Sequence, residues 1–155
     1  MILCGRVKLL IARFLKAQEK SYEIALQELI NGKKCKHWKW YIFTQLKALG
    51  RSETAVFYGI VDANEAKSYF EYPILKVRLT ACCKAILLHK DRLALGIFGD
   101  VDAIKLKSSM TLFALVCGEE DSIFFKYWHN FSAEEWISVR RNFLPRKRTN
   151  KTEKI

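Results

Sequence analysis

The sequence predicts an all-α protein, a single compact orthogonal array of about seven or eight helices around one buried central helix. Three observations lead to this fold class. The 155 residues include only two prolines and seven glycines, so few positions interrupt long helices. Half of the residues are hydrophobic and 13% are aromatic, which is typical of a chain with a packed core. Apolar residues recur at helical spacing, and no strand-like alternation is long enough to compete.

Two helices are expected at the start of the chain, followed by a third that is rich in tryptophan. Apolar spacing predicts helices over 9–19 and 21–30, with Ser21 as the N-cap of the second. Gly32, after an asparagine, supplies a left-handed stop. The basic connector KKCK then leads into a helix over 37–49, whose apolar residues form a core-facing stripe.

The next helices are predicted from their N-terminal residues. Ser52 is the cap of a short helix, and Asp62 with Glu65 forms a start that resembles a capping box. Pro73 fits the first turn of a longer helix. One more short turn is expected over 91–98, closed by a glycine before the central helix.

The stretch 102–117, DAIKLKSSMTLFALVC, is the predicted centre of the fold because it has no clean solvent face at helical spacing. We expect other helices to surround it, the helix over 37–49 among them. Its two stripes, on roughly opposite sides, are Ile104, Ser108, Thr111 and Leu115, and Leu106, Met110, Phe113 and Cys117.

The chain beyond the central helix is expected to add two helices and a tail. One helix starts at residue 121 or 122, and another starts at Ser132, where SAEE matches a capping box. The all-helical domain is therefore predicted to span 1–144. Residues 145–155 hold a single apolar side chain and are expected to form a basic, disordered tail.

Cysteine usage and the N-terminal sequence favour a cytoplasmic protein. The five cysteines are odd in number and show no CxxC, which fits free thiols in a reducing compartment. Arg6, Lys8 and Arg13 interrupt the apolar start, which is too charged for a membrane span or a secretory signal. Histidines and cysteines lack the spacing of metal ligands. We expect a monomer with no membrane association, no metal and no cofactor.

Polar residues in 37–52 and 105–111 form the candidate functional site, a pocket for a small anion such as a nucleotide or an ADP-ribose-like compound. Cationic side chains would hold the anion, hydroxyls would hydrogen-bond it, and a tryptophan would stack on it. Residues two apart on a helix diverge by about 200°, and of the two lysines Lys107 is expected to line the pocket. These residue types do not distinguish binding from catalysis. The candidates are His37, Trp38, Trp40, Gln45, Arg51, Ser52, Lys105, Lys107, Ser108, Ser109 and Thr111.

The same residues have a structural interpretation. Hydroxyls on the central helix would then tie it to a neighbouring helix, the tryptophans would belong to the core, and the lysines would reach solvent. Without further information this structural interpretation is the more favoured of the two.

A different function, a non-enzymatic interaction module, is suggested by the charge. The net charge is +11, and residues 140–155 hold +6 of it, with seven basic residues against one acidic residue. Such a segment, together with the basic patch KKCKHWK, would bind nucleic acid non-specifically, or an acidic protein. The tail has no aromatic residue for base stacking, which argues against sequence-specific recognition. The candidate contacts are Arg140, Arg141, Arg146, Lys147 and Arg148.

Two long motifs, KHWKWYIFTQLKALGRS and FGDVDAIKLKSSMTLFA, resemble those of DUF1810, a family of bacterial proteins. The resemblance runs from about residue 13 to about residue 131. It implies a small all-helical domain and a cluster of motif residues at the candidate pocket, but no reaction. The family usually has proline where this chain has Thr44. Because this chain lacks that proline, the helix break that the resemblance would imply at residue 44 is in doubt.

Overall fold

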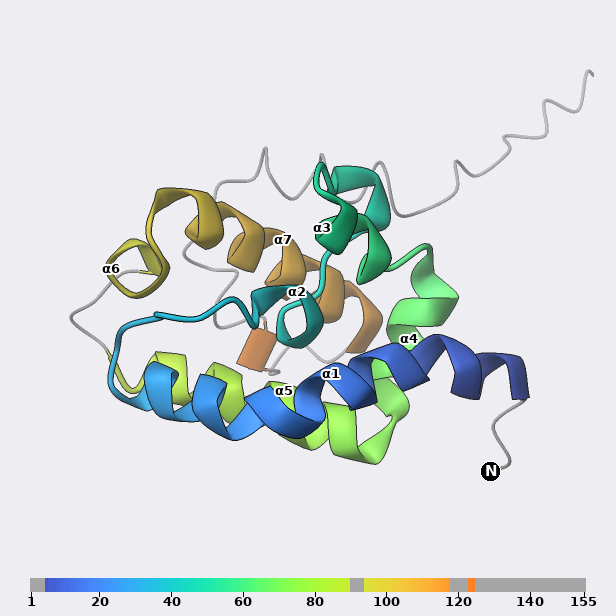
Figure 1. The fold of residues 1–155 in the computed structure, drawn as a ribbon, viewed down its shortest axis with the longest axis horizontal. Coiled ribbons are helices and arrows are strands. Elements are labelled where there is room, and N and C mark those ends of the chain that lie inside the picture. Colours follow the sequence, from blue (N-terminus) through green and yellow to red (C-terminus); the bar gives the residue numbers. More distant parts are fainter. Residues whose placement is uncertain (1–4, 90–93, 118–122, 125–155) are drawn as a thin grey trace, which may run out of the picture.

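The structure is a computed structural model that describes residues 5–89, 94–117 and 123–124. In this part of the chain it is all-α, as predicted, with helices joined by short connections and no β-strand (Figure 1). The elements are α1 (Gly5–Ile30), α2 (Lys39–Ile42), the 3-10 helix η1 (Lys47–Leu49), α3 (Glu53–Phe57), α4 (Ala63–Glu71), α5 (Pro73–Leu87), α6 (Ala94–Phe98) and α7 (Asp100–Cys117).

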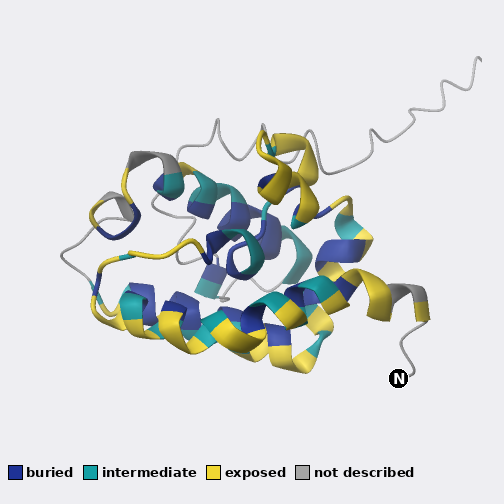
Figure 2. Ribbon diagram, in the orientation of Figure 1, coloured by how far each residue is buried: buried dark blue, intermediate teal, exposed yellow. Residues whose placement is uncertain are grey.

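The long helices α1 and α5 lie side by side along one edge of the molecule (Figure 1). The inner face of α1 is buried, whereas its outer face is exposed (Figure 2). The predicted division at Ser21 is wrong, because α1 continues through this residue and the Ser21 hydroxyl donates to the carbonyl of Ala17 at 2.6 Å. Good helix formers on both sides of Ser21 favour the continuous helix. The predicted stop at Gly32 is confirmed, with φ of 77°.

The predicted helix over 37–49 is also wrong, since the structure contains only the single turn of α2 and the 3-10 turn η1 there, with extended chain between them. Side chains from distant helices replace the helical hydrogen bonds. Tyr69 on α4 donates its hydroxyl to the carbonyls of Tyr41 and Ile42, at 3.1 and 3.2 Å. Gln18 on α1 donates to the Tyr41 carbonyl at 2.6 Å. These donors satisfy the carbonyls at the C-terminus of α2, so the turn ends there without proline at residue 44.

After α2 the chain is extended and pairs with the segment that follows α3. Lys47 N donates to the Ile60 carbonyl at 2.8 Å, and Ile60 N donates to the Gln45 carbonyl at 2.9 Å. Gly59 lies against this segment. A Cβ atom at residue 59 would stand 2.5 Å from the Cα atom of Lys47, closer than any real contact. The two backbones therefore touch, and only glycine fits between them.

The predicted starts of α3, α4 and α5 are confirmed. Ser52 accepts a hydrogen bond from the backbone N–H of residue 55, and Asp62 accepts one from the N–H of Glu65. Pro73 occupies the first turn of α5. In contrast to a standard capping box, the Glu65 carboxylate accepts from the N–H of residue 61 and from the guanidinium of Arg13 on α1.

Helix α7 follows Gly99, which has φ of 78°, and packs mainly against α4 and α6. Leu106, Met110 and Phe113 are fully buried, as predicted. Ile104 is 61% exposed, so the expectation of a helix buried on every side is wrong, and α7 has a solvent edge. The ion pair between Lys39 and Asp102 joins α2 to α7, and Ile42, Phe43 and Leu46 of the 37–49 segment are buried in the same core as α7.

Most predicted features beyond the central helix fall on residues that the structure does not describe, namely the stop at residue 118, nearly all of the last two helices and the basic tail with its five candidate contacts. The described exception is Ile123 and Phe124, which are helical, with Phe124 buried against Phe70 and Phe113. Nucleic-acid binding by that tail stays a prediction. Among the described residues, no helix is long and apolar enough to cross a membrane.

Candidate functional site

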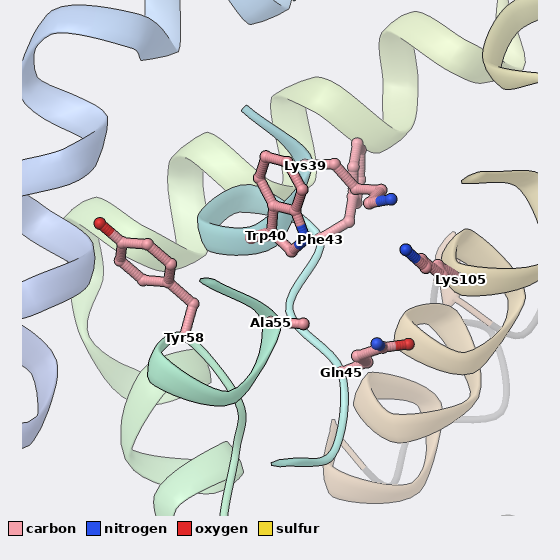
Figure 3. A pocket seen from close by; sticks show the side chains of 7 residues that line it. All are labelled: Lys39, Trp40, Phe43, Gln45, Ala55, Tyr58 and Lys105. Carbon is pink, nitrogen blue, oxygen red and sulfur yellow. The ribbon is translucent and has the colours of Figure 1, made fainter. Parts of the chain in front are cut away.

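A small pocket lies between α2 with the segment after it, α3 and α7, and we call it the lysine pocket. It encloses about 220 Å³ of empty space, part of which is open to solvent. Figure 3 shows the ammonium ends of Lys39 and Lys105 facing each other across it. The lining residues are Lys39, Trp40, Phe43, Gln45, Ala55, Tyr58 and Lys105.

Lys39 is the most deeply placed cation of the pocket, with a side chain that is only 4% exposed. Its ammonium group forms an ion pair with the Asp102 carboxylate on the first turn of α7. The other oxygen of the same carboxylate lies 3.0 Å from the ammonium of Lys34. One carboxylate therefore serves two lysines, and the third lysine, Lys105, adds a further positive charge at the same place.

This crowding of positive charge changes the protonation of Lys39. Burial lowers the pKa of Lys39, and the neighbouring ammonium of Lys105 lowers it further, while the pairing with Asp102 raises it; the net result is a pKa of about 8. Burial acts to raise the pKa of Asp102, but the hydrogen bonds from Lys39 and Lys34 hold it below its usual value. Asp102 is thus the anionic member of the cluster across the physiological pH range.

Asp102, Lys105 and Ser109 follow one another on α7 at three- and four-residue spacing, and the first two reach Lys39 on α2. Ser109 is fully buried, and its hydroxyl has no hydrogen-bond partner among the described residues. The indole N–H of Trp40 on the pocket wall is likewise buried without a partner in this part of the chain. Unpaired buried donors are costly, and they are common where a ligand binds.

Trp40 forms an aromatic wall of the pocket. Its ring stacks on the imidazole of His37, with 5.8 Å between ring centroids and 28° between planes. The Lys39 ammonium lies 5.3 Å from the ring centroid, in the range of a cation–π interaction. His37 itself is exposed and covers the outer part of this wall.

The loop before α2 is held by Glu28, at the end of α1. One oxygen of its carboxylate accepts three hydrogen bonds, from the N–H of Cys35 at 2.8 Å, the N–H of Lys36 at 3.1 Å and the indole of Trp38 at 2.7 Å. Partial burial acts to raise the pKa of Glu28, but these hydrogen bonds hold it below its usual range. The position of Lys39 in the pocket is therefore fixed from α1.

The structure brings three of the predicted site residues into the pocket, namely Trp40, Gln45 and Lys105. The expectation that Lys107 rather than Lys105 lines the pocket is wrong, because the turn of α7 directs Lys105 toward α2. Trp38 is 1% exposed and packs in the core against Phe43 and Phe98.

The remaining predicted residues lie outside the pocket lining. Arg51 is exposed, and Ser52 uses its hydroxyl to cap α3. The hydroxyls of Ser108 and Thr111 donate to carbonyls one turn back on α7, at 3.4 and 2.9 Å. These two hydroxyls therefore neither line the pocket nor tie α7 to a neighbouring helix, so neither interpretation of the sequence describes them.

Sequence reasoning missed Lys39, Asp102 and Tyr58. A signal existed for the first two, since a lysine between two tryptophans and an aspartate at the start of an apolar helix are both unusual enough to suggest buried charge. Tyr58 carried no such signal. Among the described residues, no group of three or more histidine, cysteine or acidic side chains is arranged to hold a metal ion.

Comparison with known proteins identifies the family. A family model described as "Protein of unknown function (DUF1810)" matches residues 8–136. The chain belongs to DUF1810. The fold of this DUF1810 protein is similar to the crystal structure of the conserved hypothetical protein Rv1873 from Mycobacterium tuberculosis, with a TM-score of 0.74 and 36% sequence identity. The match covers 83% of this chain and 94% of that one. No curated protein matches this DUF1810 sequence.

Proposed function

We propose that this DUF1810 protein binds a small anionic ligand in the lysine pocket through a carboxylate or phosphate group. The observation that carries the proposal is the convergence of the Lys39 and Lys105 ammonium groups beside a single carboxylate, Asp102, which Lys34 also shares. An anion between the two ammonium groups would offset their repulsion, and two cations with free donors match the oxygens of a carboxylate or phosphate.

The other lining residues support an anion with a small body. Gln45 offers an amide donor beside Lys105, and the buried indole N–H of Trp40 is a further unused donor. Phe43, Ala55 and Tyr58 supply apolar surface around these polar groups. A few convergent polar groups in an otherwise apolar lining are typical of a small-molecule site.

The size of the pocket limits which ligands it can hold. Small-molecule sites commonly enclose about 300–1,000 Å³. The lysine pocket encloses far less than this, because its 220 Å³ of empty space includes open solvent. It would take a carboxylate or phosphate end group, and the rest of the ligand would lie outside the pocket. For a nucleotide or an ADP-ribose-like compound, only a terminal phosphate would enter, and the rest would lie over Trp40 and His37 at the surface.

The test is a titration of the full-length protein with acetate and with inorganic phosphate, observed by NMR at the indole N–H of Trp40. We expect saturable shifts of this resonance, weaker at high salt because the attraction is electrostatic. Lys105→Met should weaken binding at least about tenfold through loss of one charge-assisted hydrogen bond. Lys107→Met is the matched control on the same helix and should leave binding unchanged. Equal losses in the two variants, or no saturation, would contradict the proposal.

A further inference from the structure

We infer that Lys39 is a nucleophilic amine that forms an imine with a small aldehyde or ketone whose carboxylate or phosphate group is held beside Lys105. This assignment deepens the proposed function and rests on it, because the anionic group positions the carbonyl carbon at Lys39. It takes the site from binding to covalent chemistry, with small oxo acids or phosphorylated carbonyl compounds as the ligand class.

The geometry that supports this chemistry is the grouping of three charges. Lys39 is buried at the pocket wall, a second ammonium from Lys105 faces it, and the Asp102 carboxylate touches its Nζ atom. A desolvated lysine beside another cation is a recognised way to obtain a reactive amine. The carboxylate supplies the group that imine formation needs for proton transfer. Among the described residues, the cluster also includes Lys34, whose ammonium group pairs with the other oxygen of Asp102.

A usable amount of free amine follows from the surroundings of Lys39. With a pKa of about 8, roughly one-tenth of Lys39 is neutral at pH 7, about 300 times the neutral fraction of an ordinary lysine. The groups that face Lys39 are Asp102 and Lys105 on α7, and Trp40 on its own helix. Burial, and after it the neighbouring ammonium of Lys105, keep the pKa of Lys39 low, and the charge of Lys105 also attracts the anionic end of the ligand.

The proposed step balances as follows. The neutral Lys39 amine attacks the carbonyl carbon and forms the new C–N bond while the carbonyl π bond breaks, and the oxygen takes up a proton from solvent. The Asp102 carboxylate accepts one proton from the nitrogen, which gives the carbinolamine, and returns that proton to the hydroxyl group. The C–O bond then breaks, water departs, and the C=N double bond of a protonated imine forms, with one proton still on the nitrogen. No oxidant or reductant takes part in this step.

Glyoxylate is a suitable probe because it is the smallest aldehyde that carries a carboxylate. The full-length protein is treated with glyoxylate and cyanoborohydride at pH 7. Hydride transfer to the imine carbon then fixes it as carboxymethyl-lysine, which peptide mass spectrometry assigns to a residue. We expect Lys39 to be modified at least about tenfold faster than Lys67 and Lys84, which are exposed.

Two variants complete the test. Lys39→Arg keeps the positive charge opposite Asp102 and should lose the fast modification. Lys105→Met should slow modification of Lys39 at least about tenfold. It removes one of the groups that lower the pKa of Lys39, and it also removes the cation that would hold the carboxylate of glyoxylate. Lys107→Met should leave it unchanged. Circular dichroism and thermal unfolding confirm that each variant is folded before the rates are compared.

The outcomes separate this inference from the proposed function. Fast, selective modification of Lys39 that acetate slows supports both. Modification that simply follows exposure, with Lys67 ahead of Lys39, overturns the imine chemistry. If acetate still shifts the Trp40 indole resonance in that case, the proposed anion site stands and only the covalent step is wrong. If acetate neither binds nor protects, both are wrong.

Discussion

The Lys39 ammonium and the Asp102 carboxylate form an ion pair across 63 positions of sequence, and the pair fastens α2 to the first turn of α7. Lys39 is nearly inaccessible, and Asp102 is about one-fifth exposed. A charge in such a place depends on its partner, since neither side chain can reach bulk water freely. The same ion pair joins two elements of the fold and places charged groups at the lysine pocket.

Removal of the carboxylate should therefore destabilise the protein strongly. Asp102→Asn leaves Lys39 and Lys34 without their shared anion, and we expect a loss of about 2–3 kcal/mol in the free energy of unfolding, because a buried charge loses its partner. Urea denaturation measures this loss. Glu71→Gln is the control, since it removes an exposed pair with Lys67 and should cost less than about 0.5 kcal/mol. Similar losses in both variants would show that the Asp102 cluster is not special.

The low pKa of Lys39 predicts a pH dependence of stability. Its pKa is about 8 in the folded protein and near the ordinary value of 10.5 after unfolding. Between these values the unfolded chain binds more protons, so the contribution of Lys39 to stability rises with pH from about 8 to about 10.5. The difference in unfolding free energy between wild type and Lys39→Met should move in favour of wild type by on the order of 1–3 kcal/mol over this interval. A constant difference would contradict the assignment.

The lowered pKa of Glu28 predicts a pH dependence of stability in the acidic range, whereas that of Lys39 lies in the basic range. Its pKa is lowered in the folded protein by the hydrogen bonds to the loop, so the stability it contributes is present above its unfolded pKa. That contribution is lost as the pH falls through the folded pKa. Glu28→Gln should cost about 1–2 kcal/mol at pH 7 and much less at pH 3. Chemical denaturation at the two pH values tests this, and an equal cost at both would exclude an ionised acceptor.

The hydrogen bonds of Tyr69 allow a prediction of how much stability is lost when the carbonyls of α2 lose a donor. Its hydroxyl serves the carbonyls of Tyr41 and Ile42 and accepts from Gln18 at 2.9 Å, all in the core. Tyr69→Phe removes one donor and one acceptor without a large change of volume. We expect a loss of about 1–3 kcal/mol and faster amide exchange in α2, measured by hydrogen exchange. Unchanged exchange there would mean that other groups end the helix.

The cysteines predict a clear order of thiol reactivity. Cys35 is exposed, whereas Cys82 and Cys83 are buried in α5. Burial raises the pKa of Cys82 to about 12 and that of Cys83 well above its ordinary value, so neither forms the reactive thiolate at pH 8. In the native protein a thiol reagent should modify Cys35 within minutes and the buried pair only after denaturant is added. Mass spectrometry of tryptic peptides assigns the sites.

Much of the fold could be predicted because its signals are local. Ser52, Asp62 and Pro73 start their helices through contacts within a few residues, and such contacts can be read from the sequence alone. The long buried faces of α5 and α7 also follow from spacing. The length of α2 could not be predicted, because Tyr69 and Gln18 end it from other helices.

The candidate site was predictable only in part, for the same physical reason. The two motifs that meet at the pocket were identified, but which side chains meet depends on the rotation of α7 about its axis. That rotation is set by packing against α4 and α6, and it selects Lys105 rather than Lys107. Lys39 and Asp102 are far apart in the sequence, so their pairing has no local signal.

Gly59 has a consequence for the pocket that it does not line. It follows Tyr58 directly, and it lies against Lys47, two residues after Gln45, so it separates two lining residues by the thickness of bare backbone. Any side chain at residue 59 would push the segment of Tyr58 away from the segment of Gln45 and would widen the pocket. The width of the lysine pocket is thus limited by the bare backbone of a residue that does not line it.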